Sequence, residues 1–369
     1  MLCVRAPGRV NLIGEHTDYN DGYVLPVAIS LETRVYARPR ADTKCILYSD
    51  TLDEQAGFDL RAIPEPTELP SGFVRYVAGV AWALQTCTGR TLTGIEATVC
   101  SDLPLGAGLS SSAALEAAFA TLWNTLDNLR LDKLTLAQRC QQAEQVYAGV
   151  QCGLMDQAAS LLCEAGSALF LDTRTLFVQS VALPPEWAIV VADTGKPRAL
   201  AESEYNLRRA QCEEAAQAFR NLLSEEVIAL RDVSPEQAAL YLPLLEEPAR
   251  RRARHVIGEN ARVLEFLTAL RHADAKRVRH LMLASHASLR DDYEVSCAEL
   301  DAMVAACLHA GAIGARMTGA GFGGACIALV EKASLEPFLH AAKQYYRQHA
   351  SYEPRFWACE AVGGASVCL

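Results

Sequence analysis

The stretch Leu103–Ala118, LPLGAGLSSSAALEAA, joins a glycine-rich loop to the start of a helix. Gly106 and Gly108 permit tight backbone turns and leave room beside the chain for a bulky anion. The run Ser110–Ser112 can cap the helix and supply hydroxyl ligands, and the residues from Ala113 onward are strong helix formers. Because a helix N-terminus offers unpaired N–H groups and a positive dipole end, the stretch is suited to binding phosphate.

The same stretch has a simpler interpretation. It lacks the lysine of the common Walker loop, which requires Gly-Lys-Ser or Gly-Lys-Thr. Small residues at a helix start also serve to pack the helix closely against its neighbours. The loop alone therefore leaves phosphate binding and close packing equally open, and the other segments of the chain must decide between them.

Length and composition limit the classes of protein. A chain of 369 residues is long for one hydrophobic core and predicts two domains. The pair Pro184-Pro185 marks the expected boundary, which gives an N-terminal domain of residues 1–183 and a C-terminal domain of residues 184–369. Strands and helices alternate irregularly, which favours an α+β fold over a regular series of βαβ units.

The charge and the cysteines indicate the kind of partner and compartment. The net charge of −10 argues against a nucleic-acid or anionic-membrane partner. The first residues, MLCVRAPGRV, lack the apolar run of a signal peptide, and no apolar run is long enough to span a membrane, so we expect a cytoplasmic protein. None of the 13 cysteines forms a C-x-x-C pair, so we expect no zinc site of that kind and mostly buried, reduced thiols.

A run of four polar residues follows the strand-like stretch Val10–Ile13 and Gly14. Carboxylates and imidazole together supply the acceptors and donors that a polyol needs. The alternative is a solvated turn, because Asn20-Asp21-Gly22 is itself a turn signal. The four polar residues are Glu15, His16, Thr17 and Asp18.

Two further segments carry chemistry. In Gln151–Gln157, Asp156 lies among small and apolar residues near an expected helix start. Such an aspartate is either a buried helix cap or a catalytic carboxylate. A second glycine cluster, Gly319–Gly324, separates two expected strands.

Taken together, these segments resemble the galactokinase family, a branch of the GHMP kinase superfamily that also contains homoserine, mevalonate and phosphomevalonate kinases. Arg9–Tyr19 (RVNLIGEHTDY) is similar to the galactokinase signature, and Leu103–Ala113 to the superfamily's ATP-binding loop. Arg316–Gly324 (RMTGAGFGG) is similar to the third motif of the superfamily. The resemblance covers nearly the whole chain. It implies a two-domain GHMP-kinase-like α+β fold with the active site in the cleft between the domains.

The implied activity is ATP-dependent phosphorylation of D-galactose at the anomeric O1, which yields α-D-galactose 1-phosphate and ADP in galactose catabolism. The implied partners are galactose, ATP and Mg²⁺, and the implied state is a monomer. Two alternatives remain. One is a kinase for a related sugar such as N-acetylgalactosamine or arabinose. The other is a non-catalytic galactose and ATP sensor, which the retained Ser112-Ala113 pair disfavours.

The resemblance also implies roles for individual residues. Arg9 and Asp156 are the implied catalytic pair, and Ser112 and Glu144 are the implied magnesium ligands, since hard oxygen ligands suit that ion. The implied sugar-binding residues are Glu15, His16, Asp18, Gly153, Asp156 and Tyr205. The implied nucleotide-binding residues are Gly106, Ala107, Gly108, Leu109, Ser110, Ser111 and Ser112, with Phe73 and Tyr76 near the adenine.

Two of these roles have alternatives. Asp156 either accepts the proton of the sugar O1 or only orients that hydroxyl. A carboxylate beside Arg9 and a magnesium ion is a weak base, so we favour orientation with late proton transfer. Phe73 and Tyr76 could equally belong to the core of their helix.

Overall fold

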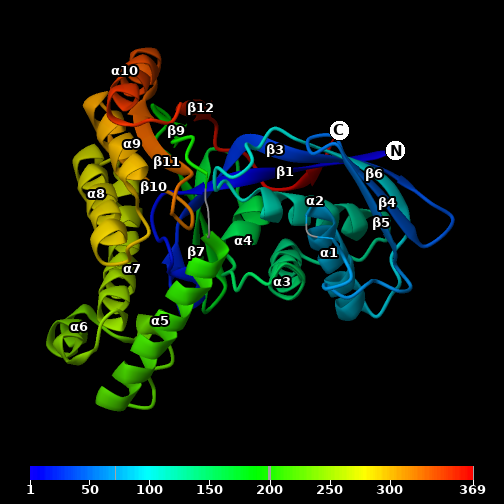
Figure 1. Cartoon of the computed structure of the whole chain (residues 1–369), viewed down its shortest axis with the longest axis horizontal. Coiled ribbons are helices and arrows are strands. Elements are labelled where there is room, and N and C mark those ends of the chain that lie inside the picture. Colours follow the sequence, from blue (N-terminus) through cyan, green and yellow to red (C-terminus); the bar gives the residue numbers. More distant parts are fainter. Residues whose placement is uncertain (71, 198–200, 369) are drawn as a thin grey trace.

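The computed structural model describes residues 1–70, 72–197 and 201–368, and most of their strands lie in two separate sheets (Figure 1). The first sheet has six strands in the order β13-β1-β3-β6-β4-β5, antiparallel except for the β4–β6 pair. Their bounds are β1 Leu2–Asn11, β3 Pro26–Pro39, β4 Lys44–Ser49, β5 Glu54–Asp59, β6 Ile95–Ser101 and β13 Ser366–Val367.

Helices of the N-terminal half cover one face of this sheet. Helices α2 (Ser111–Leu126) and α4 (Met155–Leu162) pack directly on β1 and β3, and α1 (Phe73–Thr88) and α3 (Lys133–Ala143) pack against them. The sheet-facing side of α2 is rich in buried alanines, which lets the helix lie close to the strands. This contact places the N-terminus of α2 next to β1.

The second sheet has four antiparallel strands in the order β10-β11-β9-β12. Their bounds are β9 Trp187–Asp193, β10 Gly314–Met317, β11 Ala325–Glu331 and β12 Arg355–Cys359. The central strand β9 is buried along its whole length, as expected for its apolar run Trp187–Ala192, and the burial extends to its last residue, Asp193. A third, small sheet joins β2 (Tyr23–Val24), β7 (Ser167–Asp172) and β8 (Phe177–Ala182).

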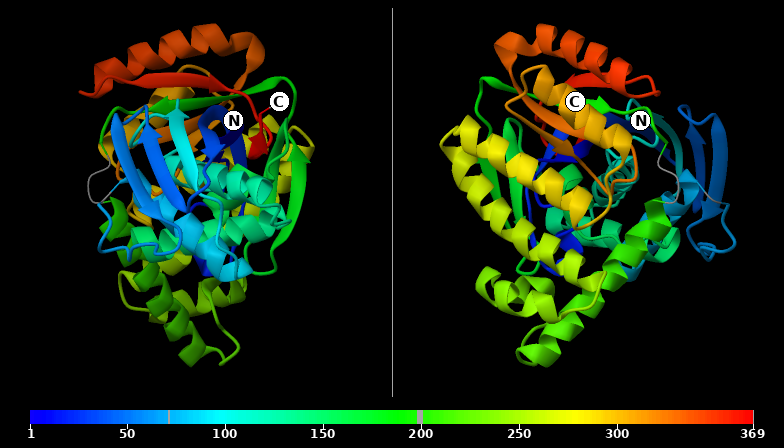
Figure 2. Two further views of the ribbon diagram at one scale, coloured as in Figure 1. Left: turned by 90° about the vertical axis from the view of Figure 1, so that its right-hand side faces the viewer. Right: turned by 60° about the vertical axis from the view of Figure 1, so that its left-hand side comes forward.

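Helices α8 (Ala275–Asp291) and α9 (Ala298–His309) pack on the four-stranded sheet, and α7 (Ala249–Arg271) and α10 (Leu335–His349) pack against these helices. Both views in Figure 2 show α10 at the outer edge of the molecule. The remaining helices are α5 Ala201–Leu222 and α6 Pro235–Tyr241. Short 3₁₀ segments lie at Asp18–Asn20, Leu230–Asp232, Leu242–Leu244 and Lys332–Ser334, and a π-helical turn lies at Glu144–Ala148.

One hydrophobic cluster joins the two halves of the chain. It contains Leu12 and Leu109 from the N-terminal half, and Ile189, Phe266 and Ile327 from the C-terminal half. Each of these side chains is almost fully buried. Apolar packing therefore holds the segment before the polar run at Glu15, and the glycine-rich loop before α2, against the second sheet.

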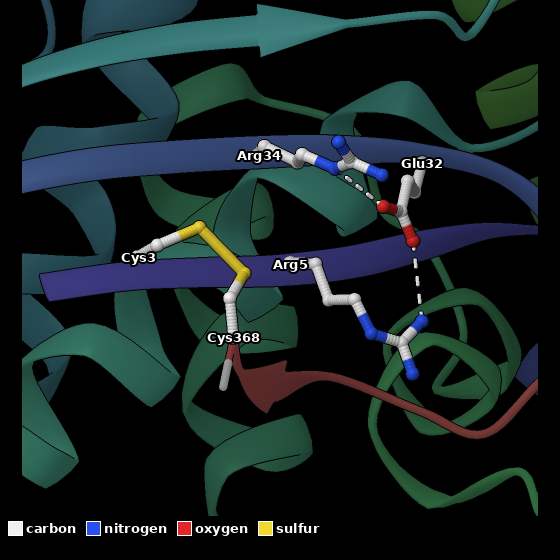
Figure 3. The surroundings of a disulfide bond; sticks show 5 residues. All are labelled: Cys3, Arg5, Glu32, Arg34 and Cys368. Carbon is white, nitrogen blue, oxygen red and sulfur yellow. Dashed lines mark hydrogen bonds and ion pairs between the residues drawn. A yellow bond between two sulfur atoms is a disulfide. The ribbon is translucent and has the colours of Figure 1, made fainter.

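The end of the chain returns to its beginning. The tail strand β13 pairs with β1, and a disulfide links Cys3 to Cys368 (Figure 3). Beside it, Glu32 accepts hydrogen bonds from Arg5 at 3.1 Å and Arg34 at 2.6 Å. The sequence predicts mostly reduced thiols, and this pair is an exception that no cysteine spacing in the sequence indicates. Among the described residues, no helix is long and apolar enough to cross a bilayer.

Candidate active site

The loop before α2 turns sharply at three positions. Gly106, Gly108 and Ser110 have φ angles of 74°, 80° and 59°, and α2 begins at the next residue, Ser111. The left-handed backbone of a serine is uncommon and indicates a specific local constraint. The predicted capping role is wrong for Ser110, because its hydroxyl makes no cap hydrogen bond and donates to the carboxylate of Asp156.

Arg9 connects this loop to Asp156. Its Nε and Nη2 atoms donate to the two oxygens of Asp156 at 2.7 and 2.8 Å, and Nη1 donates to the carbonyl of Gly108 at 2.8 Å. Burial alone lowers the pKa of Arg9, but Asp156 and Glu15 outweigh it and raise that pKa above its usual value. A charged guanidinium with two further N–H groups is thus fixed between the loop and the aspartate.

Glu144 and Ser112 bring two side-chain oxygen atoms together near Asp156. The Ser112 hydroxyl donates to Glu144 Oε1 at 3.1 Å. Glu144 lies in the π-helical turn after α3, a kind of irregularity that is frequent at functional sites. Burial and the nearby Asp156 raise the pKa of Glu144 to about 7. Two oxygen donors fit Mg²⁺, which usually keeps several waters and takes its other ligands from substrate phosphates.

The carboxylate of Glu15 joins the first and third motifs. Its Oε1 accepts hydrogen bonds from Thr318 Oγ1 at 3.1 Å and from the N–H of Gly319 at 2.8 Å. Its Oε2 accepts from Asn11 at 3.1 Å, and the side chain is buried. Gly319 itself lies against the phosphate loop, since an added Cβ would meet the Gly108 carbonyl oxygen at 3.0 Å. The three glycine-rich or polar motifs of the sequence therefore meet at one point.

His16 is held in an aromatic cluster. Its Nδ1 forms a hydrogen bond of 2.8 Å with the hydroxyl of Tyr19, which forms another of 2.6 Å with Tyr293. The ring of Tyr205, on α5, lies 5.6 Å from the His16 ring. Burial, together with His255 nearby, holds the pKa of His16 well below its usual value, so the imidazole is neutral at pH 7.

Asp18 lies against Gly153 and the start of α4. Its carboxylate accepts hydrogen bonds from the N–H groups of Tyr19 at 3.1 Å and Met155 at 3.4 Å. Burial, and then the charge of Asp156, raise its pKa to about 7. A Cβ at Gly153 would lie only 2.1 Å from Asp18 Oδ2, so the glycine makes room for this carboxylate.

Nearly all predicted site residues surround one cavity of about 440 Å³. The exception is Ala107, which is buried in the cluster that joins the two halves and donates its N–H to the Pro104 carbonyl at 3.4 Å. The lining residues predicted from the sequence are Arg9, Glu15, His16, Asp18, Phe73, Tyr76, Gly106, Gly108, Leu109, Ser110, Ser111, Ser112, Glu144, Gly153, Asp156 and Tyr205.

The sequence did not predict one wall of this cavity. Ser49, the last residue of β4, and Thr51 and Leu52, which follow this strand, line the cavity together with Phe73 and Tyr76. Phe73 also belongs to the core of the N-terminal half, so the cavity-wall and core interpretations both apply to it. The residues after β4 carry no motif, and only the fold brings them to the cavity.

Comparison with known proteins defines the class. Residues 75–164 match the family described as GHMP kinases N terminal domain, and residues 266–348 match GHMP kinases C terminal. A solved mevalonate kinase shares the fold, with a TM-score of 0.69 at 17% identity over 98% of this chain and 100% of that one. The fold and the cavity thus define a GHMP-type small-molecule kinase.

Closer relatives narrow the class. Residues 2–39 match the galactokinase galactose-binding signature. The chain is 46% identical to the Roseiflexus sp. (strain RS-1) galactokinase (98% of this chain, 92% of the relative) and 43% identical to the Homo sapiens galactokinase (100% and 93%). The Lactococcus lactis galactokinase, solved in complex with galactose, superposes with a TM-score of 0.92 at 37% identity over 99% of this chain and 94% of that one. The chain belongs to the galactokinase family.

Proposed function

We propose that this protein transfers the γ-phosphoryl group of ATP to the anomeric hydroxyl of D-galactose, forming α-D-galactose 1-phosphate and ADP. The observation that carries the proposal is the Arg9–Asp156 pair, which lies between the phosphate loop and the polar cluster of the galactose-binding signature in one cavity. ATP is the co-substrate of this family of kinases.

Positioning and charge neutralisation account for most of the catalysis of phosphoryl transfer. The loop Gly106–Ser112 would hold the triphosphate through its backbone N–H groups and the N-terminus of α2. Arg9, buried and charged, would stabilise the charge that develops on the transferred group. Asp156 would orient the O1 hydroxyl and accept its proton late, as O1 bonds to phosphorus and the bond from phosphorus to the ADP oxygen breaks.

Magnesium is the expected metal, held by Ser112 and Glu144. When bound, the ion would neutralise charge on the phosphate oxygens. The oxygen-only donor pair and the position of Glu144 next to Asp156 support this assignment.

We propose that Asp18 recognises the sugar by hydrogen bonds to its ring hydroxyls, including the axial O4. Its carboxylate lines the cavity next to Gly153, and an acceptor that the wrong epimer leaves buried and unpaired costs about 1–3 kcal/mol. Glu15, His16 and Tyr205 would complete the sugar pocket.

An assay that couples ADP release to galactose addition tests the activity, and a panel with N-acetylgalactosamine and arabinose tests the related sugars. A sensor would bind galactose and ATP without ADP release. We also propose that the protein works as a cytoplasmic monomer, whose two domains divide near residue 184 with the cavity between them.

A further inference from the structure

Behind the expected metal site lies a second buried carboxylate, that of Glu116. It sits on α2, one helical turn beyond Ser112, and is fully buried. Among the described residues Glu116 has no ion-pair partner, and it is not one of the residues that line the cavity. Its one hydrogen-bond partner in the described structure is Gln157 on α4, whose Nε2 donates to Glu116 Oε2 at 3.1 Å.

Gln157 bridges Glu116 to the metal site. The same Nε2 atom also donates to Glu144 Oε2 at 2.5 Å, while Ser112 donates to the other oxygen of Glu144 at 3.1 Å. Side chains therefore contact both oxygens of Glu144. Ser112 on α2 donates to Oε1, and Gln157 on α4 donates to Oε2, which also accepts from the Cys152 thiol at 3.6 Å. The amide of Gln157 therefore helps to orient Glu144, and Glu116 accepts a hydrogen bond from the same amide nitrogen.

Two oxygen atoms of this network have unused hydrogen-bonding capacity within the described residues. Glu116 Oε1 and Gln157 Oε1 are both buried without a hydrogen-bond partner. They belong to two groups that already face each other through their remaining atoms. Burial, and then the charge of Glu144, raise the pKa of Glu116 well above its usual value, which favours the uncharged carboxyl at this buried position.

We propose that Glu116 is a positioning residue for the magnesium site, acting through Gln157 to orient Glu144. This inference rests on the proposed function, because it assigns Glu144 to the metal of a metal–ATP substrate. A group that only fills the core between α2 and α4 would affect folding stability but not the dependence of nucleotide binding on the metal.

Three variants and one control separate these roles. Glu116→Leu removes the acceptor for Gln157, whereas Glu116→Gln keeps an oxygen that can accept the same hydrogen bond. Gln157→Leu breaks the bridge from its other end and serves if Glu116→Leu does not fold. The control is Ser160→Ala. Ser160 lies on α4, as Gln157 does, but outside the network, and the substitution removes its buried hydrogen bond to the Pro7 carbonyl on β1.

The measurement is the affinity for AMP-PNP, a non-hydrolysable ATP analogue, by calorimetry with and without Mg²⁺. The dissociation constant without Mg²⁺, divided by the constant with Mg²⁺, reports the metal site without any turnover. We expect Glu116→Leu and Gln157→Leu to reduce this ratio at least about tenfold, a loss of about 1.4 kcal/mol of metal coupling. Glu116→Gln and Ser160→Ala should stay within about threefold of the wild type, and galactose affinity should change little in any variant.

A wild-type ratio in folded Glu116→Leu and Gln157→Leu would overturn the proposal. Equal losses of galactose affinity and metal-free nucleotide affinity would overturn it as well, since they indicate a general structural role. Galactose turnover of the wild-type protein is measured separately. Its absence would count against the proposed function, while the metal ratio would still decide the role of Glu116.

Discussion

Arg9 and Asp156 are separated by 147 residues in the sequence, and the guanidinium of one holds both carboxylate oxygens of the other, at 2.7 and 2.8 Å. Arg9 comes from β1 and Asp156 from the first turn of α4. The hydroxyl of Ser110 and the carbonyl of Gly108 tie the same pair to the phosphate loop. An ion pair fixed in this way has little freedom left, as required of groups that must meet a transferring phosphoryl group.

The role of Asp156 can be tested by two substitutions. Asp156→Asn can still accept from Arg9 and align a hydroxyl, whereas Asp156→Ala can do neither. We expect Asp156→Ala to lower kcat by about 10³-fold or more, within the range of acid–base and positioning effects, and Asp156→Asn to retain clearly more turnover. Steady-state kinetics measure this, with Ser160→Ala on the same helix as control. If both variants are equally inactive and still bind galactose, the general-base interpretation is favoured instead.

Asp18 should determine affinity for the sugar and not for the nucleotide. Asp18→Ala removes the acceptor that faces the cavity next to Gly153. We expect the KM for galactose to rise by about 10- to 100-fold, and the KM for ATP to stay nearly unchanged, because a lost buried hydrogen bond costs about 1–3 kcal/mol. Equal increases in both KM values would contradict the assignment.

Gly153 gives a test of the same pocket without removing a polar group. In Gly153→Ala the added Cβ would lie 2.1 Å from Asp18 Oδ2, so the carboxylate must move. We expect the KM for galactose to rise about as much as in Asp18→Ala, with normal ATP affinity. The matched control is Gly363→Ala, where a Cβ meets only backbone atoms at 4.0 Å. Unchanged galactose affinity in Gly153→Ala would show that Asp18 does not need its present position.

The pKa of Asp18 predicts a pH dependence of stability. Burial and Asp156 raise this pKa from 3.8 to about 7. Between these values the folded protein keeps a proton that the unfolded chain has lost, so this group makes the free energy of unfolding fall as the pH rises through the interval. Asp18→Asn removes the titration and should flatten the fall.

Between pH 4 and pH 8, we expect the free energy of unfolding to fall by about 1–3 kcal/mol less in Asp18→Asn than in the wild type. This range is a fraction of the full value for such a pKa shift. Urea unfolding at a series of pH values measures the difference. Part of the slope should remain, because the pKa of Glu144 is also raised to about 7. Identical pH profiles for the two proteins would be evidence against a raised pKa of Asp18.

The predictable part of the site lies in short segments whose chemistry is local. The loop around Gly106 and Gly108 shows its turns in its composition, and the polar run beginning at Glu15 has no place in an ordinary core. Both were found from the sequence, and the structure brings them to one cavity. The α+β fold was likewise expected, because the strands and helices do not alternate regularly.

The rest depends on packing between distant segments. The hydrogen bonds that Glu15 accepts from Thr318 and Gly319 depend on the contact between the first and third motifs, which lie about 300 residues apart in the sequence. The pairing of Glu116 with Gln157 depends on how α2 and α4 lie together on the sheet. Nothing in the local sequence marks Glu116 or Gln157, because a glutamate or glutamine inside a helix is normally exposed to solvent.

The central claim is that the Arg9–Asp156 pair marks the point of phosphoryl transfer to galactose. The most direct test is ³¹P NMR of the products after incubation with galactose and MgATP, for the wild type and for Arg9→Ala. We predict one ADP per sugar phosphate, with the phosphate on O1 in the α configuration, and a loss of about 10³-fold or more in rate for Arg9→Ala, as for other arginines that stabilise phosphoryl transfer. Phosphate on another hydroxyl, release of inorganic phosphate alone, or full activity of Arg9→Ala would contradict the claim.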